Sequence, residues 1–138
     1  MKKLLSLILC LILSISCFAF TTNAAVIENE TVSPMYNYTS AVTSTLSISS
    51  KTATCKSTIV GKTGVTTKIV ITQRLQKKND DSWNNVQTWT KTVNAVNATF
   101  TNTKSSLATG TYRTRTIAKV YKGTAYETIY KNSTTVTI

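Results

Sequence analysis

Cations on two predicted strands are the residues of this chain best placed to bind a ligand. Alternation places Ile69, Ile71 and Leu75 on the inner side of one strand, so the cations of the other parity face outward. If Tyr112 enters the core from a second strand, the cations that follow at odd positions also face outward. We therefore predict one outward set: Lys68, Arg74, Arg113, Arg115 and Lys119. Such a set attracts polyanions, but an ordinary solvated sheet face can look the same.

Four aromatic side chains are candidates for stacking on sugar rings. Trp89, Tyr126 and Tyr130 are the three that we predict to be free for binding. Trp83 is instead expected to pack at the edge of the core, as a structural residue. Aromatic rings of this kind combine a large apolar surface with a polar tip, which suits a glycan ligand.

Catalytic and metal chemistry have little support in this sequence. The chain holds no histidine, which removes the commonest general base, the usual zinc ligand and every histidine-containing triad. Asp80 and Asp81 adjoin in a predicted loop, whereas glycoside hydrolysis needs carboxyl groups on opposite sides of the scissile bond. We predict a protein that is not an enzyme and takes no metal or cofactor.

Residues 1–25 have the three-part layout of a secretory signal peptide. Two lysines precede an apolar run over residues 4–20, and small residues follow at Ala24 and Ala25. We expect cleavage after Ala24 or Ala25 and secretion of the remainder. Two alternatives stay open, because the run is just long enough for a retained membrane anchor and Cys17 could be the acylated residue of a lipoprotein.

Cys55 is the only cysteine outside the predicted signal segment, so the exported domain can form no internal disulfide. It shares its strand parity with Ala53 and Ile59, and no histidine exists to activate its thiolate. We predict a buried, free thiol that serves as a small apolar side chain.

The rest of the chain is predicted to form a short leader and one β domain. Residues 26–39 hold the only proline and show no periodicity, which predicts a flexible leader. Residues 40–138 are rich in Thr, Val and Ile, which favour a pleated, half-buried sheet. Turn segments separate the alternating runs at about 8–12 residues, which predicts seven or eight strands in a sandwich or barrel.

Two motifs within residues 40–138 resemble parts of known β-sandwich modules. The segment LQKK at 75–78, followed by SWNNV at 82–86, resembles a hairpin of immunoglobulin-like repeats on bacterial surface proteins. The segment LATGTYR at 107–113 resembles the corner motif of fibronectin type III and related sandwiches. The chain as a whole resembles small exported β-sandwich proteins of Gram-positive bacteria, a resemblance that implies no activity.

The resemblance implies an all-β fold, a seven- to eight-stranded immunoglobulin-like β-sandwich. In the corner motif, Gly110 would permit the turn, Leu107 would plug the edge of the core, and the Tyr112 hydroxyl would bond back to the backbone. The same topology would make the two cation-bearing strands neighbours, so that the five cations would share one sheet face.

The function that we expect is that of an exported, non-enzymatic binding module for anionic or glycan-rich surfaces, such as a wall polymer or mucus. A net charge of +11 suits such partners and also peripheral contact with anionic membranes. No specific nucleic acid is expected, and retention at the wall would be non-covalent. Two alternatives remain: a secreted antimicrobial or toxin that acts on anionic membranes, and a structural subunit that pairs through sheet edges.

Overall fold

The structure, a computed structural model, describes residues 35–138, which contain eight β-strands and no helix. The predicted signal peptide, its cleavage site and residues 26–34 of the predicted leader lie outside the described residues. The strands are β1 (Thr39–Ser49), β2 (Thr52–Gly61), β3 (Lys68–Asn79), β4 (Ser82–Val93), β5 (Asn97–Lys104), β6 (Thr111–Lys122), β7 (Ala125–Asn132) and β8 (Val136–Thr137).

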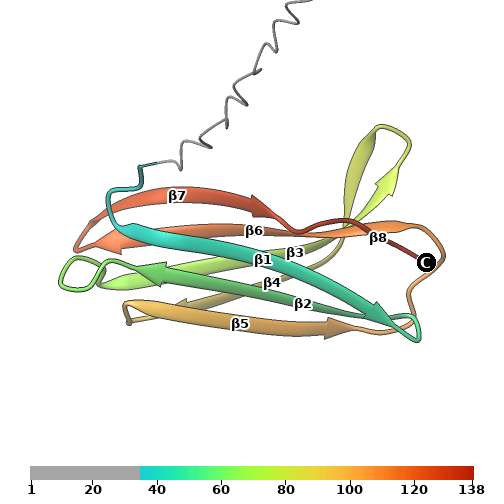
Figure 1. Ribbon diagram of the computed structural model, residues 1–138, viewed down its shortest axis with the longest axis horizontal. Helices are drawn as coiled ribbons and strands as arrows, with labels where there is room; N and C mark the ends of the chain where they lie inside the picture. The colour runs from blue at the N-terminus through green and yellow to red at the C-terminus, as the bar shows by residue number, and fades with distance from the viewer. Residues whose placement is uncertain (1–34) are drawn as a thin grey trace, which may run out of the picture. The chain divides into compact units, whose positions relative to one another are not determined.

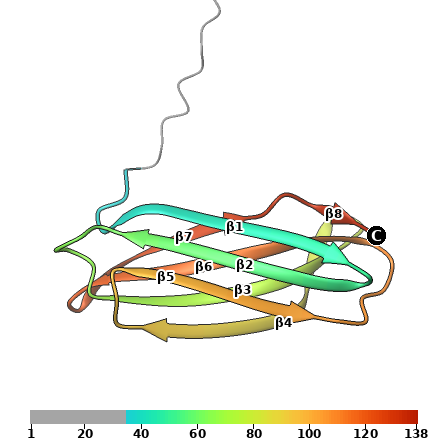
Figure 2. The same ribbon diagram turned by 60° about the horizontal axis from the view of Figure 1, so that its bottom comes forward.

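The strands form two antiparallel sheets that pack face to face. One sheet has the order β1-β2-β5, and the other has the order β4-β3-β6-β7, with the short β8 paired to β6. Figures 1 and 2 show the two sheets as separate layers. The predicted all-β sandwich is therefore confirmed. The predicted adjacency of the two cation-bearing strands is confirmed as well, because β3 and β6 pair over residues 68–77 and 112–121.

The core between the sheets contains two apolar clusters, built mainly from the inward residues of β2, β3 and β6. Their spacing along each strand follows the two-residue period of a β-strand, which is why alternation in the sequence revealed them. One cluster comprises Ile59, Ile69, Ile71, Ala98, Ala118, Val120 and Ile129. The other comprises Leu46, Ala53, Cys55, Leu75, Leu107 and Tyr112.

Gln73 is fully buried between these clusters and connects the two sheets. Its amide nitrogen donates to the Ser57 hydroxyl at 2.8 Å and to the Phe100 carbonyl at 3.2 Å. Its amide oxygen accepts a bond of 2.8 Å from the Asn102 side chain. Gln73 belongs to β3, whereas its three partners belong to β2 and β5 of the opposite sheet.

The hydrogen-bond chain continues from Ser57 through buried hydroxyl groups. The Ser57 and Thr116 hydroxyl oxygens lie 2.6 Å apart, and Thr116 donates onward to Ser44 at 2.9 Å. Ser44 then donates to the Thr114 carbonyl at 3.2 Å. Because a hydroxyl has one proton and Thr116 gives its own to Ser44, Ser57 is the donor to Thr116. All bonds of the chain therefore run in one direction, an arrangement in which each bond polarises the next.

The corner before β6 has the predicted geometry. The Tyr112 hydroxyl donates to the Ala108 carbonyl at 2.6 Å, and Leu107 is buried in the core. Gly110 has a φ of 151°, a value that residues with a Cβ rarely adopt. The Lys77 side chain also lies against Gly110, where a Cβ would collide with it. The predicted structural roles of Leu107, Gly110 and Tyr112 thus agree with their positions.

Cys55 is free and fully buried, as predicted from its strand parity. Burial raises the pKa of the Cys55 thiol, which keeps it in the neutral form. The thiol packs with Leu75 and Tyr112 in one cluster of the core. It is therefore a packing residue in this fold.

We expect the variant Cys55→Ser to destabilise the domain by about 1–3 kcal/mol, because it places a hydroxyl in an apolar site. The free energy of unfolding from denaturant titration is the measurement. A maleimide should label the native Cys55 thiol far more slowly than it labels the unfolded chain. Rapid labelling under native conditions would contradict the buried position.

The predicted leader ends earlier than expected, because the residues before β1 are tied to the sandwich. The Glu127 carboxylate accepts the backbone N–H groups of Asn37 at 2.8 Å and Tyr38 at 3.0 Å. The Tyr38 carbonyl accepts a bond of 2.6 Å from the Thr66 hydroxyl, and the Tyr36 side chain packs against the core. Residues 36–39 therefore belong to the folded domain, which corrects the predicted leader boundary at residue 39.

Candidate anion-binding face

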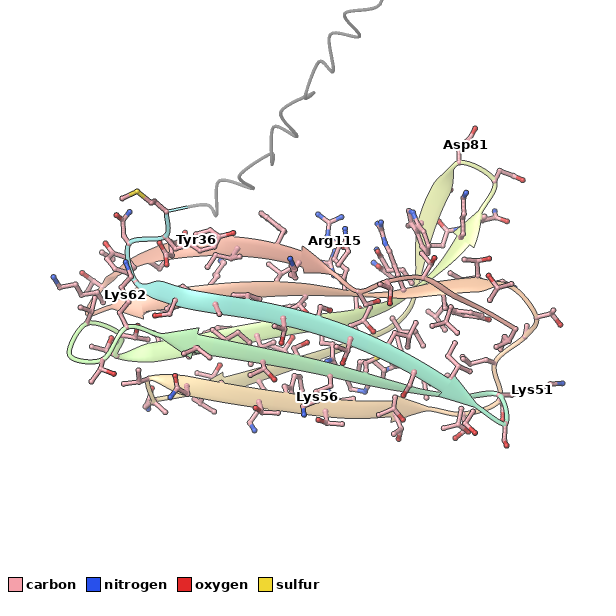
Figure 3. All side chains as sticks on the ribbon, viewed as in Figure 1. Tyr36, Lys51, Lys56, Lys62, Asp81 and Arg115 are labelled. Carbon is pink, nitrogen blue, oxygen red and sulfur yellow. The ribbon has the colours of Figure 1, made fainter. Side chains whose placement is uncertain are left out.

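The basic face is the name used here for the outer side of the β4-β3-β6-β7 sheet. Along residues 68–75 of β3 and 111–121 of β6, residues of one parity are buried and residues of the other parity are partly or fully exposed. The pairing places Lys68 opposite Tyr121, and Arg74 opposite Arg115. Figure 3 shows Arg115 pointing away from the sandwich, whereas Lys56 lies on the other sheet. The structure brings all five predicted cations to this face: Lys68, Arg74, Arg113, Arg115 and Lys119.

Within residues 35–138, no carboxylate occupies an outward position of the basic face. Asp80 and Asp81 lie in the turn of the β3–β4 hairpin, whose end projects from the sandwich (Figures 1 and 3). Glu127 is opposite the core residue Val120 and uses both carboxylate oxygens on the chain before β1. The outward cations are therefore not neutralised by acidic neighbours from these strands.

Aromatic rings hold four of the five cations by cation–π contacts, in which a positive charge sits over the negative face of a ring. The Lys68 ammonium lies 4.0 Å from the centre of the Tyr121 ring, and the Lys119 ammonium lies 5.1 Å from that of Tyr126. The Arg113 guanidinium lies 4.1 Å from the centre of the Trp83 ring, and the Arg115 guanidinium lies 5.3 Å from the centre of the Tyr130 ring.

The exposed tyrosines make the face mixed in character. Tyr126 and Tyr130 are 52% and 60% exposed, so the predicted aromatic residues of β7 do lie on this surface. Tyr121 and Tyr126 also pack against each other, with ring centres 5.1 Å apart. The outward positions of β6 and β7 thus carry both cationic and aromatic groups.

The two tryptophans lie on the opposite sides from those predicted. Trp89 is opposite the buried Gln73 and packs against the core, so it is not a free aromatic group for binding. Trp83 contacts Arg113 on the basic face rather than the edge of the core. The reason is a β-bulge in β4, where the pairing passes over Val86. An extra residue in one strand moves all residues beyond it to the opposite face.

Arg113 is held in place by a small polar group under the bent hairpin. Its Nε donates to the Gln76 side-chain oxygen at 2.9 Å, and the Gln76 amide donates to the Asn85 side chain at 2.9 Å. Gln76 is only 4% exposed although it lies on the outer side of the sheet. Partial burial and the nearby charge of Arg115 lower the pKa of Arg113 from its ordinary value. The guanidinium still carries its charge at neutral pH.

Sequence reasoning missed two residues of the basic face. Tyr121 shares the parity of Lys119 and Arg115 on β6, so the same alternation could have found it. Gln76 has no comparable signal, because the sequence does not reveal that Arg113 and the hairpin cover it.

Comparison of the chain with protein-family models and with curated proteins gives no match. Within residues 35–138, no helix is long and apolar enough to span a membrane. The same residues contain no group of three or more His, Cys, Asp or Glu side chains that could hold a metal ion.

Proposed function

We propose that this protein is an exported, non-enzymatic binding module that attaches to an anionic polymer through the basic face. The observation that carries the proposal is the convergence of five cations on one face without a carboxylate among them. Charge on an exposed face attracts polyanions over the range of a Debye length, about 8 Å at physiological ionic strength. Wall polymers and the acidic glycans of mucus are the partners that fit this chemistry.

The aromatic residues of the basic face would add contacts with sugar rings of such a polymer. Tyr126 and Tyr130 present large exposed rings beside the cations of β6. An anionic glycan would therefore meet charge and stacking surfaces together, and this combination is why we propose a glycan polymer as the partner.

The β4 strand bears on the alternative of a structural subunit that pairs through sheet edges. β4 is an edge strand with mostly exposed residues. It carries a bulge at Val86 and an exposed cation at Lys91, two features that oppose edge-to-edge pairing. These features oppose the pairing of subunits through the β4 edge.

Binding of the purified domain to immobilised dextran sulfate, with neutral dextran as the matched control, tests the proposal. We expect retention on the sulfated polymer at low salt, release as salt rises, and no retention on neutral dextran, because screening weakens exposed charges. Purified wall fragments and mucin then replace dextran sulfate as natural polymers. Equal retention on the two dextrans, or retention that salt does not change, would contradict a charge-driven mode.

A further inference from the structure

Arg74 and Arg115 form an unusual like-charge pair on the basic face. They are direct cross-strand partners on β3 and β6, a position in which two side chains lie about 5 Å apart at their Cβ atoms. Like charges placed directly opposite each other destabilise a sheet. A pair of this kind in the centre of a sheet therefore calls for a compensating group.

The Nε atoms of both arginines add a second, independent observation. Each Nε is shielded from solvent and has no hydrogen-bond partner among residues 35–138. A buried N–H donor without an acceptor carries a free-energy cost, which is larger for a charged group. An acceptor bound at the outer surface would bond the terminal N–H groups of the same guanidinium groups, since the Nε atoms themselves are shielded.

The surroundings of the pair limit what that acceptor can be. Arg113 lies two residues from Arg115 on the same side of β6, and its own Nε is already used by Gln76. Its terminal N–H groups are not used by Gln76, and its guanidinium lies over the Trp83 ring. The strand neighbours on the outer side are neutral: Thr88 is opposite Arg74, and Asn132 is opposite Arg115. Three arginines therefore occupy neighbouring outward positions of β3 and β6 without a carboxylate among them.

We propose that Arg74 and Arg115, assisted by Arg113, form a discrete binding site for a phosphate- or sulfate-ester group. This inference rests on the proposed function and specifies the ligand class at the basic face. A guanidinium presents paired N–H donors in a planar fork that matches two oxygens of such a group. A tetrahedral oxyanion offers enough oxygens for two or three guanidinium groups, whereas a carboxylate offers only two oxygens.

The sharpest test replaces arginine with lysine, which keeps the positive charge but lacks the paired N–H donors of a guanidinium group. The variant Arg74→Lys/Arg115→Lys is compared with wild type for binding to inorganic sulfate, inorganic phosphate and dextran sulfate. We expect affinity for these anions to fall about tenfold or more, with net charge unchanged. The control Lys51→Arg/Lys56→Arg, placed away from the basic face, should bind like wild type.

A second measurement uses the wild-type protein alone and does not depend on how the variant folds. The side-chain Nε–H signals of Arg74 and Arg115 are followed by NMR during titration with sulfate, phosphate, acetate and chloride at equal ionic strength. We expect both signals to shift with sulfate or phosphate and to change little with acetate or chloride. The sulfate and phosphate titrations, compared with each other, tell which ester the site prefers.

The results separate this inference from the proposed function. If the double lysine variant binds dextran sulfate as strongly as wild type does, the discrete site is overturned and charge-driven binding is left intact. Nε–H shifts with phosphate, in a protein that no polymer retains, would support the site and overturn the proposed function. Equal responses to acetate and sulfate would overturn the assigned ligand class.

Discussion

Neutralising the five cations of the basic face is expected to reduce affinity for an anionic polymer about a hundredfold or more. Each exposed cation near an anionic surface contributes on the order of 1 kcal/mol. The variant changes these residues to glutamine: Lys68, Arg74, Arg113, Arg115 and Lys119. The rings on the same face remain, so the loss reports the charge contribution. The measurement is the dissociation constant for dextran sulfate at low salt.

The matched control for this variant removes charge elsewhere in the chain. Lys51 lies in the turn between β1 and β2, Lys56 lies on the β1-β2-β5 sheet (Figure 3), and Lys104 is opposite the buried Ala53. Changing these three to glutamine should cost much less affinity per charge removed. If the five-site variant binds like wild type, the basic face is only a solvated surface. Salt-insensitive binding that is lost in Tyr126→Ala would instead assign binding to the aromatic residues.

Replacing Gln73 with alanine is expected to destabilise the domain by about 3–5 kcal/mol. The change removes a fully buried side chain and leaves a cavity between the two apolar clusters. It also removes a hydrogen-bond partner of the Asn102 amide, the Ser57 hydroxyl and the Phe100 carbonyl. Denaturant unfolding of the purified variant gives the free energy to compare with wild type.

The control for the Gln73 prediction is Gln87→Ala, because Gln87 is an exposed glutamine of β4. Its change should stay within about 0.5 kcal/mol of wild type. A double-mutant cycle of Gln73→Ala with Ser57→Ala should give a coupling energy of about 0.5 kcal/mol or more, because the two side chains share a bond. A Gln73→Ala loss below about 1 kcal/mol would contradict a stabilising hydrogen-bond chain.

The strands could be predicted because their signal is local. Successive side chains of a strand point to opposite faces, so alternation alone placed Ile69 and Ile71 inside and predicted that Cys55 is buried. The corner at 107–113 was also local, since Tyr112 bonds to a carbonyl only four residues away. The outward direction of the cations followed from the same parity. Their position on one shared face followed from taking β3 and β6 as neighbours.

The buried hydrogen-bond chain could not be predicted, because its bonds join residues far apart in the sequence. Gln73 and Ser57 are 16 residues apart, and Ser57 and Thr116 are 59 apart. Parity marks each of them as inward, but it does not say which polar group meets which. The same limit applies to Glu127, which holds Asn37 from 90 residues away and so extends the folded domain.

By itself, the sequence determined the β class, the inward parity of the core strands and the charge of the outward residues. Only the tertiary structure decided which groups meet on the basic face. Trp83 and Trp89 have the same parity in the sequence, yet the bulge at Val86 places them on opposite sides of β4. The position of a bulge depends on how two strands pair, and a shift of one residue reverses the face of every side chain beyond it. The pairing that brings Arg74 opposite Arg115 is likewise a property of the assembled sheet.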